Sequence, residues 1–156
     1  MKAASPAQPD GRGLKVAVVH AAFNADVVSG LLEGARAALL EMGVLAKDVT
    51  VVEVPGAFEL PLAARAAAQH ARFDAVVALG AVVRGETDHY EHVAREAAAG
   101  LAAVARESGV PVGFGVLTVR DQTLARTRSV PGPDNKGAEA ARAAVAMVHA
   151  LRKLRG

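Results

Sequence analysis

Cysteine is absent from this chain of 156 residues, which excludes disulfide bonds and thiolate metal ligands. Tryptophan is absent as well, and only one tyrosine and four phenylalanines are present. No apolar run approaches the roughly 18 residues of a membrane-spanning helix, and the N-terminus has no apolar signal segment. We therefore expect a soluble, cytoplasmic protein with no membrane partner.

Charge of one sign is also scarce, because 18 Lys and Arg residues nearly balance 16 Asp and Glu residues, for a net charge of +2. No basic stripe with interleaved aromatic residues is present, so nucleic-acid binding is not expected. Hydrophobic residues make up 52% of the chain, and many of them are alanine. The length favours a single domain, and the small side chains favour closely packed helices.

The pattern of elements predicts one α/β domain over residues 14–156, preceded by a flexible N-terminal tail at residues 1–13. Apolar runs of strand length alternate with helical patterns, which is typical of a parallel sheet covered on both faces. We expect a three-layer αβα sandwich with a four- to five-stranded parallel, flavodoxin-like sheet. The expected strands are 14–20, 49–54, 74–79 and 112–119, and the expected helices are 27–42, 57–70, 87–107, 121–128 and 136–154.

The segment GAVVRGETDHYEHV, residues 80–93, has the richest chemistry. It follows an apolar strand, and ligands bind at the carboxyl ends of the strands in open α/β sheets. Backbone N–H groups of Gly85, Glu86 and Thr87 are expected at a helix start, where they can hold an anion such as phosphate. His89, expected one turn further in, can take and give a proton near neutral pH. An isolated histidine is more often only solvated, but this position favours an enzyme.

Three of the four phenylalanines follow or occupy expected strands. Phe23 comes just after the first strand, Phe58 just after the second, and Phe114 inside the fourth. Each could be an ordinary core residue. A planar heterocycle could instead stack on a ring at the carboxyl ends of the strands. This placement favours a ligand platform for Phe23 and leaves both interpretations open for the other two.

Five segments together carry a resemblance to a known family. They occur in the order and at the spacing seen in the lumazine synthases, over essentially all of residues 14–154. The segments are AAFNADVV (21–28), VPGAFELP (54–61), GAVVRGETDHYEHV (80–93), PVGFGVLTV (111–119) and DNKGAEAA (134–141). The chain therefore resembles the lumazine synthase family of riboflavin biosynthesis.

The resemblance implies a reaction that needs no metal and no other cofactor. Lumazine synthases join 5-amino-6-(D-ribitylamino)uracil to 3,4-dihydroxy-2-butanone 4-phosphate, giving 6,7-dimethyl-8-ribityllumazine, phosphate and water. Imine formation, phosphate loss and ring closure require positioning, proton transfer and a phosphate clamp. The implied partners are small-molecule substrates, further copies of the chain arranged in pentamers, and riboflavin synthase.

The resemblance also implies roles for individual residues. His89 shuttles protons, and residues 85–87 hold the phosphate. Phe23 stacks on the pyrimidine, whose edge bonds to backbone groups of residues 81–83, and Asn24 lies close to the ribityl chain. The full substrate-binding set is Phe23, Asn24, Gly56, Ala57, Phe58, Glu59, Ala81, Val82, Val83, Gly85, Glu86, Thr87, Phe114, Arg126, Arg128 and Lys136.

Two further groups complete the implied site. Ala57, Phe58 and Glu59 meet the ribityl chain, and the Glu59 carboxylate accepts hydrogen bonds from its hydroxyls. Phe114, Lys136 and one arginine reach the site from the adjacent subunit. Lys136 opens a helix, where a cation is slightly disfavoured, so an anion is expected nearby.

The phosphate arginine has two candidates. The segment DQTLAR, residues 121–126, matches the family pattern Glu-Gln-Ala-x-x-Arg and indicates Arg126. Counting forward from Leu117 or back from Lys136 indicates Arg128 instead. Two positions apart on a helix, the two arginines cannot share one face. We favour Arg126 on the motif and retain Arg128 as the alternative.

The oligomer and two other function classes remain open. Aligned through Arg126, the segment SVPGPD (129–134) is two residues longer than in the family, where extra residues tend to block a 60-subunit shell. We therefore expect a free pentamer or a pair of pentamers. A flavodoxin-like module that binds flavin or nucleotide without catalysis is the alternative, and a structural or carrier shell is the third interpretation. The flavodoxin-like module does not need His89, Glu59 and Lys136 together.

Overall fold

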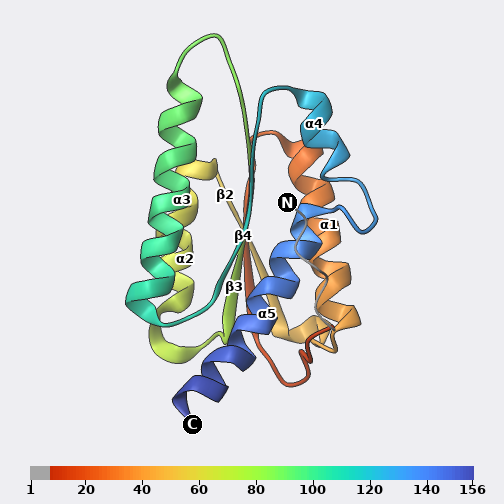
Figure 1. Cartoon of the computed structure of the whole chain (residues 1–156), viewed down its shortest axis with the longest axis vertical. Coiled ribbons are helices and arrows are strands. Elements are labelled where there is room, and N and C mark those ends of the chain that lie inside the picture. Colours follow the sequence, from red (N-terminus) through yellow and green to blue (C-terminus); the bar gives the residue numbers. More distant parts are fainter. Residues whose placement is uncertain (1–7) are drawn as a thin grey trace.

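A computed structural model, described for residues 8–156, contains a parallel four-stranded sheet between two layers of helices (Figure 1). The strand order is β2-β1-β3-β4, so β2 and β4 are the edges. The strands are β1 Val16–Ala21, β2 Val49–Val54, β3 Ala75–Val83 and β4 Val112–Val119. The predicted three-layer sandwich is confirmed, with four strands in the described part of the chain.

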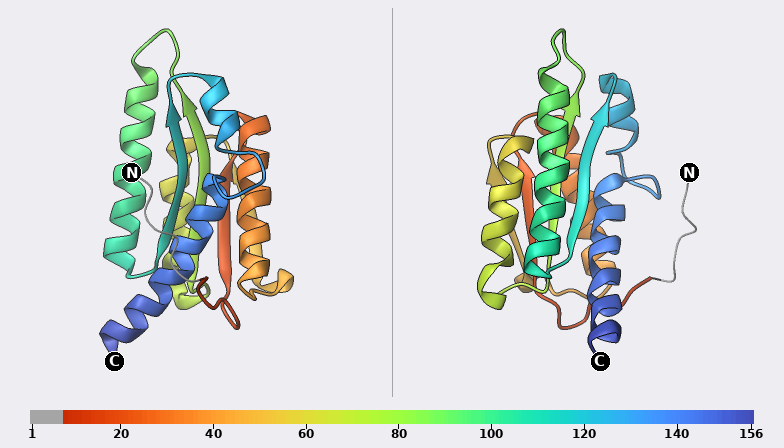
Figure 2. Two further views of the ribbon diagram at one scale, coloured as in Figure 1. Left: turned by 45° about the vertical axis from the view of Figure 1, so that its right-hand side comes forward. Right: turned by 60° about the vertical axis from the view of Figure 1, so that its left-hand side comes forward.

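Helices α2 and α3 cover one face of the sheet, and α1, α4 and α5 lie on the other (Figures 1 and 2). A helix forms each crossover between consecutive strands, as parallel pairing requires. The α-helices are α1 Ala25–Glu41, α2 Leu60–Ala68, α3 His89–Ser108, α4 Gln122–Thr127 and α5 Lys136–Arg155. Three short 3-10 helices are η1 Ala46–Asp48, η2 Ala57–Glu59 and η3 Gln69–Ala71.

Each face of the sheet buries its own hydrophobic core. Along β3, Val77 and Leu79 pack toward α1 and α5, whereas Val76 and Ala78 pack toward α2 and α3. Full burial of a Val or Leu side chain contributes about 1.5–3 kcal/mol. The continuous apolar run of the sequence therefore becomes a strand buried on both faces, and its carboxyl end is held rigidly for a site.

Small residues bring α1 and α5 into close contact, as the alanine content predicted. A Cβ at Gly137 would overlap the carbonyl oxygen of Leu31, and a Cβ at Gly34 would overlap the side-chain amide of Asn135. Glycine therefore fits at both positions where larger residues do not. This contact fixes the start of α5 against α1.

The predicted end of the third strand is wrong. It was expected at Leu79, but β3 continues to Val83 because it pairs in register with β4 up to Val83 and Val119. Gly80 and the three residues after it therefore belong to the strand rather than to the loop.

The predicted start of the following helix is also wrong. It was expected near Thr87, but α3 begins at His89, so His89 is its first residue rather than one turn inside. The Thr87 hydroxyl accepts a hydrogen bond from the His89 N–H at 3.4 Å. Such local side-chain bonds favour a turn over continued helix.

The helix predicted for residues 57–70 is divided into η2, α2 and η3. Pro61 lies at the start of α2, where its missing N–H has no cost. His70 has a φ of 68°, which ends the regular helix before it. The other predicted elements begin and end within two residues of the observed ones.

The segment before β1 contacts the body of the domain where it is described. Residues 1–7 of the predicted tail lie outside the described residues. Within residues 8–13, the Gly11 N–H donates to the Met42 carbonyl oxygen at 2.7 Å, beyond the end of α1. The segment is therefore tied to the C-terminal end of α1.

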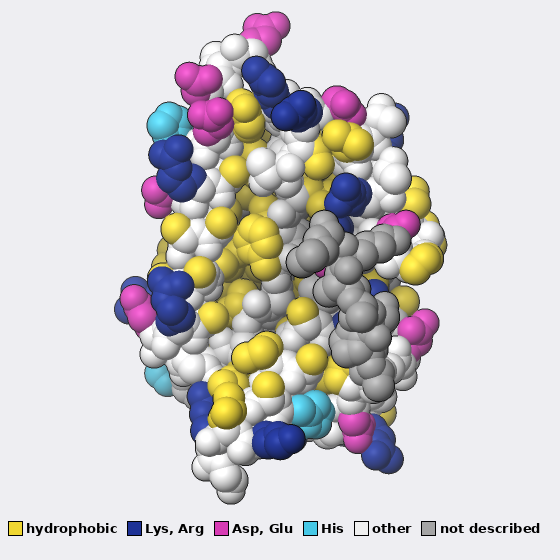
Figure 3. Space-filling view, viewed as in Figure 1, with side chains coloured by type: hydrophobic (Ala, Val, Ile, Leu, Met, Phe, Trp, Pro, Cys, Tyr) yellow, Lys and Arg dark blue, Asp and Glu magenta, His cyan; other side chains and the backbone are white. Residues whose placement is uncertain are grey.

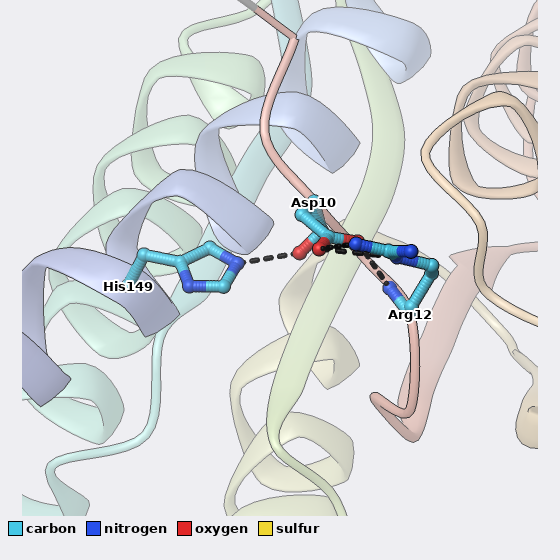
Figure 4. A network of polar contacts seen from close by, with 3 residues as sticks. All are labelled: Asp10, Arg12 and His149. Atoms are coloured by element: carbon cyan, nitrogen blue, oxygen red, sulfur yellow. Dashed lines mark hydrogen bonds and ion pairs between the residues drawn. The ribbon is translucent and has the colours of Figure 1, made fainter.

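The same segment also reaches α5 (Figure 4). The Asp10 carbonyl oxygen accepts a hydrogen bond from the His149 ring. The Asp10 carboxylate pairs with Arg12 at 2.9 Å, and hydrogen bonds from Arg12 lower the pKa of Asp10 to about 2. This network lies at the end of the domain where the strands begin, opposite their carboxyl ends.

Candidate active site

Three turns follow neighbouring strands at the carboxyl edge of the sheet, toward the top of Figure 1. They comprise residues 22–24 after β1, 55–59 after β2 and 84–88 after β3. The Phe23 N–H donates to the Pro55 carbonyl oxygen at 3.1 Å. The first two turns are therefore joined by their backbones, and the third stands beside them.

The aromatic rings near this edge are exposed. Phe23 is 72% exposed and Phe58 is 61% exposed, whereas Leu60 below them is fully buried. Gly80 on β3 leaves the room for Leu60, since a Cβ there would lie 3.2 Å from a Leu60 methyl carbon. Phe114 on β4 is 50% exposed. The interpretation of these three rings as ordinary core residues is therefore wrong for the single chain.

The turn after β2 brings the predicted ribityl-binding residues together. Gly56 precedes η2 in an extended conformation, and Ala57 is buried beneath the turn. Phe58 and Glu59 point outward, and a Cβ at Gly56 would lie 3.5 Å from Oε2 of Glu59. The Glu59 carboxylate is thus held over the backbone of Gly56, where it can accept hydrogen bonds.

Asn24 links the turn after β1 to the end of β3. It has a left-handed backbone, with φ 59° and ψ 47°, which Asn tolerates better than most residues. Its Nδ2 donates to the Ala81 carbonyl oxygen at 2.8 Å. Val82 is buried in the core and Val83 is half-buried. The sequence predicted that these residues lie together, but not that Asn24 bonds to β3.

The loop of residues 84–88 is exposed and lies directly before α3. Within residues 8–156, the N–H groups of Gly85, Glu86 and Thr87 have no protein acceptor. They precede the positive end of a helix of 20 residues, where an anion is favoured. The loop can therefore offer several donors to a phosphate.

His89 and its neighbours form the first turn of α3. The His89 side chain is exposed, and no protein partner of its ring is described within residues 8–156. Tyr90 is half-buried against the core of α2 and α3, and its hydroxyl donates to Glu91 at 3.2 Å. The His89 ring is therefore accessible to a ligand at this edge.

The remaining predicted residues lie along β4. A groove of about 840 Å³ is lined by Phe114, Arg128 and Lys136, by Arg120 and Glu139, and by mainly apolar residues of β4, α4 and α5. Figure 3 shows hydrophobic side chains gathered over the middle of this face. β4 is an edge strand in the described part of the chain, so its outer backbone groups have no strand partner. This face has the composition of an interface.

The two candidate arginines point to different places. Arg126 pairs with Asp26 of α1 at 3.7 Å, whereas Arg128 lines the groove with Phe114 and Lys136. Both Arg126 and Asp26 are exposed, so their pair contributes little to stability. The structure thus brings Arg128, and not Arg126, together with the other groove residues.

Lys136 already has an anionic neighbour. Its Nζ lies 2.9 Å from Oε2 of Glu139, three residues along α5. The sequence predicted an anion near Lys136, and Glu139 is such an anion within the chain. The spacing of three residues on a helix was the available signal.

Asn135 was missed as a positioning residue. It is buried, and its Oδ1 accepts hydrogen bonds from the Gly137 and Ala138 N–H groups at the start of α5. Its Nδ2 donates to the carbonyl oxygens of Gly30, Ser129 and Val130. Asn is a common helix cap, which was the available signal. These bonds hold the segment between Arg128 and Lys136.

The groove is distant from the carboxyl edge within one chain. Phe114 lies opposite Ala78, five residues before Val83 at the end of β3. The Phe23 turn follows β1, whose last residue, Ala21, is level with Gly80 and so roughly 7 Å further along the strands than Phe114, and β4 is two strand spacings, about 10 Å, from β1. Phe114 and the Phe23 turn are therefore separated both along the strands and across the sheet of one chain.

A sequence model of the 6,7-dimethyl-8-ribityllumazine synthase family matches residues 13–152. The chain belongs to this family. Lumazine synthases are transferases of riboflavin biosynthesis that act on small molecules and assemble as oligomers. The chain therefore has lumazine synthase activity.

Two findings accompany this assignment. No helix within residues 8–156 is long and apolar enough to cross a membrane. In the same part of the chain, His, Asp and Glu side chains do not gather in groups of three or more that could hold a metal ion.

Proposed function

We propose that each lumazine synthase site forms between two adjacent subunits, from the carboxyl edge of one and the β4 groove of the next. There it condenses 5-amino-6-(D-ribitylamino)uracil with 3,4-dihydroxy-2-butanone 4-phosphate. The observation that carries the proposal is the separation of Phe114 from Phe23 within one chain. An adjacent copy that places its groove beside this carboxyl edge brings both halves together at one place.

The pyrimidine substrate is proposed to bind at the turns after β1 and β2. Its ring stacks on Phe23, whose exposed face has no competing partner in the described chain. The ribityl chain extends along residues 56–59, where the exposed Glu59 carboxylate accepts hydroxyl hydrogen bonds. Ring and chain are then held in a fixed orientation for imine formation.

The phosphate of the second substrate is proposed to bind at residues 85–87. Their N–H groups lack acceptors in the described chain, and the helix start favours negative charge. His89 is adjacent to these donors and its ring is exposed. It is the group that moves protons during imine formation and phosphate loss.

We propose Arg128 of the adjacent subunit as the phosphate clamp, in place of Arg126. Arg128 lines the same groove as Phe114 and Lys136, whereas Arg126 is paired with Asp26. A guanidinium binds phosphate oxygens through two parallel hydrogen bonds.

The two halves of the site favour assembly into a ring. Phe58 on η2 and Leu62 on α2 are exposed, and so are Phe114 on β4 and Leu124 on α4. Contact between two unlike surfaces is heterologous, and it repeats around an axis until the ring closes. We propose the five subunits that the family resemblance implies, with riboflavin synthase as a partner that takes up the product.

The activity is tested by mixing the purified protein with both substrates and following lumazine absorbance. We expect a continuous rise, and no rise when either substrate is left out. A flavodoxin-like binding module would bind a flavin but form no lumazine. That result would remove the catalytic proposal.

The shared site is tested by complementation between two inactive variants. Phe23→Ala damages only the carboxyl edge, and Arg128→Ala damages only the groove. Co-expressed in equal amounts, the two chains should recover about a quarter of wild-type activity, because one interface in four pairs an intact edge with an intact groove. If both halves came from one chain, no activity would return.

A further inference from the structure

The pairing of β1 with β3 ends before β3 does. The last in-register pair is His20 with Leu79, whereas β3 continues to Val83. Beyond this pair, Asn24 Nδ2 donates to the Ala81 carbonyl oxygen at 2.8 Å. The Asn24 side chain thus occupies the position where a longer β1 would donate its next hydrogen bond.

The next step along β3 is open. Backbone groups of successive strand residues point to alternate sides, and the Arg84 N–H reaches the Val119 carbonyl oxygen on β4. The N–H and C=O of Val83 therefore point the other way, past the end of β1. Within residues 8–156 no hydrogen-bond partner is described for them on that side. One donor and one acceptor lie free beside the Asn24 bond.

The turn that carries the Phe23 ring is attached to two neighbouring elements. Its own N–H donates to Pro55 of the turn after β2, and the next residue, Asn24, is bound to β3. The left-handed backbone of Asn24 reverses the chain into α1, whose first turn bonds to the Asn24 carbonyl oxygen. The bond from Asn24 therefore ties the turn that carries the exposed Phe23 ring to the end of β3, where the free Val83 backbone groups lie.

We propose that Asn24 is a positioning residue that sets the spacing between the Phe23 ring and the Val83 backbone edge. In the proposed function the pyrimidine ring stacks on Phe23 and lies beside this backbone edge. The inference rests on the proposed function, and it changes the role of Asn24. Its amide N–H is used within the chain and is not a contact of the ribityl chain.

The first test compares Asn24→Asp and Asn24→Gly with the wild type. Asp keeps the size and Gly keeps the left-handed backbone, but neither can donate to the Ala81 carbonyl oxygen. We expect the KM for the pyrimidine substrate to rise about tenfold in both variants. The KM for the butanone phosphate should stay within about twofold, because the phosphate loop does not depend on this bond. Ser29→Ala, an exposed change on α1, is the matched control and should alter neither.

A second measurement separates positioning from direct contact with the ribityl chain. The dissociation constants of the full substrate and of 5,6-diaminouracil, which lacks the chain, are measured for each variant. Positioning predicts that both ligands weaken by the same factor. If only the full substrate binds more weakly, Asn24 contacts the ribityl chain directly, and the inference is overturned.

Two other results would also overturn it. One is an unchanged KM for the pyrimidine in Asn24→Asp and Asn24→Gly. The other is an equal change in both KM values together with a lowered Tm, which indicates a general structural role. If Asn24→Asp does not assemble, the same criteria are applied to Asn24→Gly. A wild-type protein without lumazine activity would instead refute the proposed function, so the two failures are distinguishable.

Discussion

The polar side chains of the proposed site differ in whether another residue of the same chain already forms a hydrogen bond or an ion pair with them. Asn24 is bonded to Ala81, and Lys136 is paired with Glu139. For the Glu59 carboxylate and the His89 ring, no such partner is described within residues 8–156. A group without a partner in the chain can bond to a ligand without breaking a bond within the chain, so proton transfer and hydroxyl recognition are expected of these two.

Replacement of His89 tests its role in proton transfer. His89→Ala should lower kcat by roughly ten- to a thousandfold, because it removes the proton shuttle but leaves the stacking ring and the phosphate donors. The absorbance assay measures the rate, and light scattering should show an unchanged assembly. His92→Ala, an exposed change three residues along the same helix, should have no effect. Full activity of His89→Ala would exclude the assigned role.

The two arginines provide a second pair of variants. Arg128→Ala should weaken use of the butanone phosphate by about 2 kcal/mol or more in kcat/KM, as expected for a charge-assisted pair. Arg126→Ala should be nearly silent, since it removes only the exposed pair with Asp26. A large loss in Arg126→Ala with little change in Arg128→Ala would assign the clamp to Arg126, as the motif indicates. If neither variant lost activity, neither arginine would be the clamp.

The residue types of the site could be predicted from the sequence, but their partners could not. The motif favours Arg126 and counting favours Arg128, because a sequence records the order of residues and not the direction of each side chain. Only the packing of α4 shows that Arg128 faces the groove. The bond from Asn24 to Ala81 joins residues 57 positions apart, a pairing that no local pattern reveals.

At the scale of elements, the buried strands were the most predictable feature, because apolar runs such as that of β3 have no alternative to the core. Their ends were less predictable. β3 gains four residues from pairing with β4, and α3 loses two to the turn at Thr87. Both shifts come from hydrogen bonds whose partners only the fold defines.

The cap of α5 provides a stability test at this scale. Asn135→Ala should lower the free energy of unfolding by about 3 kcal/mol or more, because it removes a helix cap and leaves buried backbone groups without partners. Asp121→Ala is the matched control, since Asp121 is an exposed cap that accepts one bond from the Leu124 N–H. It should cost about 1 kcal/mol. Urea unfolding at one chain concentration compares them, and equal losses would contradict the argument from burial.

At the scale of the whole molecule, the proposed ring predicts a definite mass. We expect five or ten copies of the 15.9 kDa chain. If Arg128 is the phosphate arginine, residues 129–134 are no longer than the matching segment of the family. The expectation of a free pentamer or a pair of pentamers then depends on the stiffness that Pro131 and Pro133 give to this segment. Sedimentation or light scattering measures the mass. About sixty copies would reject the expectation, and an active monomer would contradict the shared site.

The single tyrosine gives this enzyme a built-in optical reporter. Because the chain has no tryptophan, its ultraviolet emission comes from Tyr90 alone. That ring lies in the first turn of α3, next to His89 and three residues after Thr87. Inorganic phosphate does not absorb in this range, so its arrival at residues 85–87 should be readable as a change in tyrosine fluorescence, without a label or an engineered probe.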